Sequence, residues 1–72
     1  MNLPSRVTFD PQVMSGKACI RGMRITVSTV LQMLAKYPAD TVLASYPELE
    51  PEDIRAALEF AAYLAQERAL AA

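Results

Sequence analysis

The sequence predicts an α+β fold that is mostly helical, in which a short N-terminal β element precedes a three-helix core with a helix-turn-helix layout. Up to residue 27, apolar and polar residues alternate as in strands, and after it apolar residues recur at helical spacing. Pro38, Pro47 and Pro51 then divide the rest of the chain into three helical segments. We expect the 72 residues to form a single domain, with residues 1–27 as the β element and residues 28–70 as the helical core.

The β element is predicted from two short strands and a tight turn. Residues 6–9 alternate as a strand does, and Pro11 ends this strand because proline donates no hydrogen bond to a neighbouring strand. Residues 18–20 have the composition of a second strand. Gly22 supplies the positive φ that a tight turn requires, and the turn leads into residues 23–25. We therefore expect a small antiparallel β element.

The first two helices are predicted from apolar spacing and from the prolines. Thr26 or Ser28 can cap the first helix, which ends before Pro38 because the residue preceding a proline avoids helical geometry. A second, short helix begins near Ala39 and ends before Pro47. The residues expected to face the core are Val27, Val30, Leu31 and Leu34 in the first helix and Val42, Leu43 and Tyr46 in the second.

The third helix has the clearest start signal, because Pro51 takes the first helical position and acidic residues follow it. Its predicted core stripe is Ile54, Ala57, Leu58, Ala61 and Leu64 or Ala65. Residues 56–65 are apolar on nearly every side of the helix, which a single small core does not cover. We expect the surplus face, led by Phe60, Tyr63 and Leu64, to bind a partner protein. The alternative is that Phe60 and Tyr63 fold back under the β element.

Charge is distributed unevenly along the chain. The net charge is −1, yet residues 1–36 carry five cations and one acid, whereas residues 37–72 carry two cations and seven acids. Contact with nucleic acid is therefore predicted for the first half, through Lys17, Arg21 and Arg24. The alternatives are that these three side chains are solvated, or that they pair with acids in the C-terminal half of a neighbouring subunit.

The start of the third helix is acidic, which argues against base reading by this helix. Glu48, Glu50, Glu52 and Asp53 would be pushed against phosphates in the usual docking mode of a helix-turn-helix and would be repelled. Favourable interaction with the helix dipole is enough to explain these acids.

Several functional classes are not expected. The chain has no histidine and a single cysteine, Cys19, which we expect to be a buried, inert thiol. Without metal-ligand spacing or a phosphate-binding glycine loop, we expect no catalytic residue, no metal and no cofactor. The absence of a signal peptide and of a membrane-spanning run predicts a cytoplasmic protein. Because 53% of the residues are hydrophobic in a chain too short for a large core, we expect a homodimer.

Five short motifs follow one another along the chain: Phe9-Asp10-Pro11, Ser15-Gly16-Lys17, residues 20–27, Tyr46-Pro47-Glu48-Leu49 and residues 52–58. In this order they resemble the domain-of-unknown-function family 433. The chain departs from the usual family pattern at Ala18 and Met23, where proline and threonine are common. The resemblance implies a homeodomain-like fold with a helix-turn-helix core. It also implies an antitoxin of the VapB type, whose partner is a small toxin related to PIN-domain nucleases.

The favoured function is therefore non-enzymatic. It is the neutralisation of a PIN-like toxin, with autoregulatory DNA binding as a further task. The metal-binding acids of such a toxin would attract the positive side chain of Arg21, Arg24 or Arg68. Arg68 lies one helical turn beyond the apolar face of the third helix. The alternatives are a DNA-binding transcriptional regulator without a toxin partner and a purely structural dimerisation module.

Overall fold

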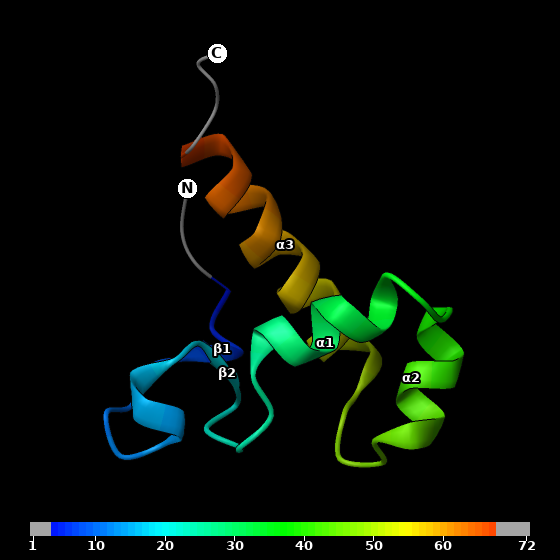
Figure 1. Cartoon of the computed structure of the whole chain (residues 1–72), viewed down its shortest axis with the longest axis horizontal. Helices are drawn as coiled ribbons and strands as arrows, with labels where there is room; N and C mark the ends of the chain where they lie inside the picture. The colour runs from blue at the N-terminus through cyan, green and yellow to red at the C-terminus, as the bar shows by residue number, and fades with distance from the viewer. Residues whose placement is uncertain (1–3, 68–72) are drawn as a thin grey trace.

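The computed structural model describes residues 4–67, which form a small β element and three helices (Figure 1). In chain order the elements are β1 (Val7–Thr8), the 3-10 turn η1 (Met14–Gly16), β2 (Cys19–Ile20), α1 (Val27–Leu34), α2 (Ala39–Ser45) and α3 (Pro51–Glu67). The predicted fold class is confirmed as a mostly helical α+β fold with a short N-terminal β element followed by three helices. Within the described residues, no helix has both the length and the apolarity that crossing a bilayer requires.

The two strands pair in the antiparallel sense, with Val7 opposite Ile20. The chain then returns beside β2, but it makes only a single bridge, between Cys19 and Thr26. Residues 23–25 therefore lead out of the turn without forming a strand of their own. The side chain of Cys19 is buried, as an inert thiol would be.

The turn after β2 has two residues in the left-handed region. Arg21 and Gly22 have φ values of 46° and 73°, and the N–H of Met23 donates to the carbonyl of Ile20 at 2.8 Å. The predicted positive φ at Gly22 is confirmed. Arg21 adopts the same conformation, although the Cβ makes it unfavourable by roughly 1 kcal/mol. Contacts of the Arg21 side chain must therefore offset this strain.

The first two helices follow the predicted pattern. The hydroxyl oxygen of Thr26 caps α1 by accepting a hydrogen bond from the N–H of Thr29 at 3.1 Å. α1 ends at Leu34, and α2 begins directly after Pro38. Of the residues expected to face the core, Val27, Val30 and Val42 are buried, whereas Leu31, Leu34, Leu43 and Tyr46 are half-buried.

α3 begins at Pro51 as predicted, but its buried face differs from the predicted stripe. The buried residues of this helix are Asp53, Ile54, Ala56, Ala57 and Phe60. The stripe was wrong for Leu58, which is 51% exposed, and for both alternatives at its end, because Leu64 is 43% exposed and Ala65 is exposed as well. α1, α2 and β1 contact α3 on the side that carries Phe60 rather than Leu58. Leu64 is exposed because the C-terminal end of α3 projects beyond α1 and the β element (Figure 1).

The hydrophobic core lies between the three helices and the β element. It consists of Val7, Ile20, Val27, Val30, Val42, Leu49, Ile54, Ala56, Ala57 and Phe60. Six of these ten side chains are valine or alanine, so the core is thin. A thin core leaves apolar surface on α1 and α3 uncovered, and this surface forms the candidate site.

Candidate partner-binding groove

A buried carboxylate lies at the N-terminal end of α3. The side chain of Asp53 is completely buried, and it is the third residue of the helix. Its Oδ2 accepts a hydrogen bond from the N–H of Glu50, the residue before the helix, at 2.8 Å. This bond is one half of a capping box, so part of the reason for the aspartate is local to the helix start.

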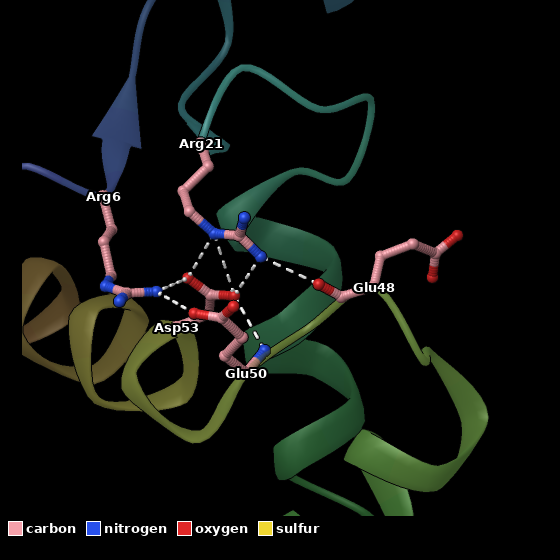
Figure 2. Close-up of polar contacts among 5 residues, drawn as sticks. All are labelled: Arg6, Arg21, Glu48, Glu50 and Asp53. Atoms are coloured by element: carbon pink, nitrogen blue, oxygen red, sulfur yellow. Dashed lines mark hydrogen bonds and ion pairs between the residues drawn. The ribbon is translucent and has the colours of Figure 1, made fainter.

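Two arginines complete the hydrogen bonding of Asp53 (Figure 2). Arg21 donates from Nε to Oδ1 at 3.0 Å and from Nη2 to Oδ2 at 2.9 Å. Arg6 donates from Nη1 to Oδ1 of Asp53 at 2.9 Å and to Oε1 of Glu50 at 2.8 Å. Arg21 Nη2 also donates to the backbone carbonyl of Glu48 at 2.8 Å. We call Arg6, Arg21, Glu50 and Asp53 the arginine–aspartate cluster.

The pKa values in this cluster follow from its contacts. Burial by itself raises the pKa of Asp53, but hydrogen bonds from Arg21, from the Glu50 N–H and from Arg6 outweigh it and lower this pKa to about 2. The pKa of Arg6 is raised, chiefly by its hydrogen bond to Glu50, and that of Arg21 by its hydrogen bonds to Asp53. Asp53 is therefore ionised at neutral pH and ties the N-terminal segment and the Arg21 turn to α3.

The three residues predicted to bind DNA have different surroundings, because Arg21 belongs to the arginine–aspartate cluster and Lys17 and Arg24 do not. The guanidinium of Arg21 is engaged by Asp53 and by the Glu48 carbonyl of the same chain. Lys17 and Arg24 are exposed and make no ion pair with another described residue. Arg24 Nη1 lies 4.0 Å from the sulfur of Met14. Lys17 and Arg24 thus face solvent, whereas Arg21 stabilises the fold through its hydrogen bonds to Asp53.

An open groove of about 770 Å³ lies between α1, α3 and the segment around η1. α1 and its C-terminal cap contribute Val27, Leu31 and Ala35, which share one face because they are spaced by four residues. α3 contributes Phe60 and Leu64, also one turn apart. The groove therefore continues the apolar faces of α1 and α3 from the buried core to the surface, where no other described element covers them.

The two edges of the groove differ in chemistry. The edge near η1 carries Met14 and Lys17, and Lys17 is the only charged side chain among the lining residues that the structure describes. The edge on α1 carries Ser28 and Gln32, which are uncharged and joined by a hydrogen bond from Gln32 Nε2 to Ser28 Oγ at 3.4 Å. The groove thus combines apolar walls, one cationic edge and one polar edge.

The predicted partner-binding residues are only partly brought together. Phe60 and Leu64 both line the groove, but Phe60 is 8% exposed and its ring packs against Phe9 with centroids 5.9 Å apart. Tyr63 is half-buried and is not among the groove-lining residues. Arg68 lies outside the described residues. The ring of Phe60 thus lies as the alternative expected for Phe60 and Tyr63 would place it, against the residue that follows β1, while Leu64 provides exposed apolar surface.

Sequence reasoning missed the groove and the burial of Asp53. It assigned Leu31 wholly to the core and did not consider Met14 or Ala35. A usable signal was present for Asp53, because an acid three residues after Glu50, with proline between them at the first helical position, matches half of a capping box. No comparable local signal marks a groove whose walls come from residues far apart in the sequence.

The fold and the groove define a class: a small α+β domain with an open, mostly apolar groove. Within residues 4–67, no group of three or more His, Cys, Asp and Glu side chains is placed to hold a metal ion. The model of the family described as protein of unknown function (DUF433) matches residues 7–61, and the chain belongs to this family. The match runs from β1 into α3 and includes Arg21 and Asp53. No curated protein and no solved structure matched the chain.

Proposed function

We propose that this protein is the antitoxin of a type II toxin–antitoxin pair and that it neutralises a PIN-like nuclease toxin by binding it. The observation that carries the proposal is the open groove, with apolar walls and the cationic edge at Lys17. Such a surface is typical of a protein that acts by association. The motifs resemble family 433, and the VapB-type antitoxin role that this resemblance implies supplies the class of partner.

The charges near the groove suit a nuclease of this class. A PIN-like toxin holds divalent metal with clustered carboxylates, and a cation from the inhibitor is attracted to them. Of the three arginines considered, Arg21 is held by Asp53, and Arg68 lies outside the described residues. Arg24 is exposed and makes no ion pair with any residue from 4 to 67. Arg24 is therefore the arginine that we assign to the toxin's acids.

The test is co-expression with the product of the adjacent gene, followed by copurification and a growth assay. We expect the neighbour to arrest growth alone, and the two proteins to copurify and restore growth together. Arg24→Glu should reduce rescue, whereas Arg55→Glu, which changes an exposed arginine on α3, should not. A harmless neighbour that does not copurify would refute the antitoxin proposal.

DNA binding for autoregulation is the second candidate, and the exposure of Lys17 and Arg24 favours it. Base reading by α3 is disfavoured, because Glu48, Glu50 and Glu52 are exposed near its start. We expect any binding to operator DNA to use the phosphates. Replacement of both Lys17 and Arg24 by alanine should reduce the magnitude of the slope of log K against log salt by about 2 for each protomer that contacts the DNA. Unchanged affinity and slope would remove this candidate.

We also propose that the chain is a homodimer. Its large exposed apolar side chains include Phe9 (53%), Tyr37 (53%) and Leu58 (51%), and self-association would remove part of this surface from water. Leu58 lies on the side of α3 away from the core, so self-association there would leave the groove open.

A further inference from the structure

The walls of the groove are two helices. Along α1 and its C-terminal cap, the lining residues extend from Val27 to Ala35, which corresponds to about 12 Å along a helix axis. On α3, Phe60 and Leu64 are separated by one turn. A helix from a partner, two to three turns long, fits between two such walls. Its side chains four residues apart can enter the spaces between Leu31 and Leu64.

The charge of the groove favours an acidic residue on the polar side of such a helix. Among the described side chains that line the groove, Lys17 is the only charged one, and none of them is acidic. Arg6 and Arg21 do not add to this potential at close range, since Asp53 and Glu50 pair with them. An occupant with an acidic residue beside Lys17 is therefore favoured over a neutral or basic one.

The uncharged edge on α1 sets the orientation of the occupant. Ser28 and Gln32 offer hydrogen bonds but no charge, so they do not compete with Lys17 for an acid. An acidic side chain on one edge of a docked helix gains attraction only when it faces the η1 edge.

We propose that the groove binds an amphipathic helix of the toxin that has large apolar side chains one turn apart and an acidic residue on the edge that faces Lys17. This inference rests on the proposed function and names the element of the toxin that docks. A second copy of the chain fits less well. The outer face of its α3 offers one large apolar side chain, Leu58, beside Ala62 and Ala65, which are too small to fill a groove of about 770 Å³.

Photo-crosslinking of the purified complex with the neighbouring gene's product tests this inference. A benzophenone amino acid at position 64 of the antitoxin should crosslink to one toxin segment with apolar residues at i and i+4 and an acid at their edge. The same group at position 58 serves as the control and should not crosslink to that segment, because Leu58 and Leu64 are similarly exposed but only Leu64 lines the groove.

Two substitutions give an independent measure of affinity. Leu64→Asp should weaken the complex at least about 10-fold, whereas Leu58→Asp should change it less than about 2-fold. Lys17→Glu should weaken it several-fold, and replacement of the crosslinked toxin acid by lysine should restore binding to this variant.

The outcomes separate the two proposals. A stable, growth-rescuing complex whose position-64 crosslinks lead to a strand, a basic segment or a second antitoxin copy overturns the helix inference and leaves the antitoxin function standing. The same holds if Leu64→Asp and Leu58→Asp bind alike. Absence of any complex, together with a harmless neighbour, overturns both proposals.

Discussion

Replacement of Asp53 by asparagine tests the role of the arginine–aspartate cluster. Asparagine preserves the size of the side chain but removes the charge that Arg6 and Arg21 neutralise. Its amide group also places N–H donors where the arginines donate hydrogen bonds to the carboxylate. We expect Asp53→Asn to destabilise the fold without blocking it, because the two arginines are a third exposed and can be hydrated.

The magnitude follows from the pKa of Asp53. A pKa of about 2 in the folded chain, against an ordinary value of 3.8, corresponds to roughly 2 kcal/mol of unfolding free energy at neutral pH. The hydrogen bond from the Glu50 N–H is already among the contacts that lower this pKa, and solvent at the partly exposed arginines screens part of the effect. We therefore expect a loss of about 1 to 2 kcal/mol at pH 7.

The same pKa fixes the direction of the pH dependence. Because the pKa of Asp53 is lower in the folded chain than in the unfolded chain, its stabilisation is complete above about pH 4. It is lost as the pH falls from about 4 through about 2. The difference in stability between the wild type and Asp53→Asn should therefore shrink over this range.

Urea unfolding followed by far-ultraviolet circular dichroism, in a pH series from 7 downwards, measures this difference. Glu52→Gln is the matched control, because Glu52 is an exposed acid in the same helical turn; its change should stay below about 0.5 kcal/mol. The reasoning fails if the two variants lose equal stability at pH 7. It also fails if the Asp53→Asn deficit is as large at about pH 2 as at pH 7.

Three further predictions concern the turn, the first helix and the oligomeric state. Gly22→Ala should lower the unfolding free energy by about 1 kcal/mol, because φ is +73° while no atom lies within 4 Å of the added Cβ; a loss above about 3 kcal/mol would reveal a clash that the geometry excludes. Thr26→Ala should cost about 1 kcal/mol through loss of the cap bond to Thr29, and Ser28→Ala, in the first turn of the same helix, should cost much less; equal effects would contradict the assignment of the cap. Light scattering after size-exclusion chromatography should give the mass of a dimer, and a monomer mass at all concentrations would contradict the proposed homodimer.

The features that could be predicted from the sequence are those with a local cause. The cap at Thr26, the start of α3 at Pro51 and the positive φ at Gly22 each depend on a few neighbouring residues. Residue type and spacing carry that information directly. The boundaries of α2 follow in the same way, because Pro38 and Pro47 flank it.

The features that could not be predicted depend on which elements meet. The hydrophobic pattern of α3 is nearly uniform over residues 56–65, so periodicity did not distinguish Leu58 from Phe60 as the buried residue. The packing of α1, α2 and β1 makes that choice. For the same reason, the pairing of Arg21 with Asp53, 32 positions apart, leaves no trace in a local window.

The uneven charge of the sequence acquires a different meaning in the fold. The opposite charges of the two halves suggested contact with another molecule, but Arg6 and Arg21 are paired with acids of the same chain. The pairing at Arg21 also offsets the strain of its positive φ and so holds the turn that precedes α1. Substitutions in the cluster should therefore change toxin binding only through the stability of the fold. Substitutions at Lys17 should change the affinity for the proposed partner without changing the unfolding free energy. Measuring affinity and unfolding free energy for each variant therefore separates the residues that stabilise the fold from those that bind the partner.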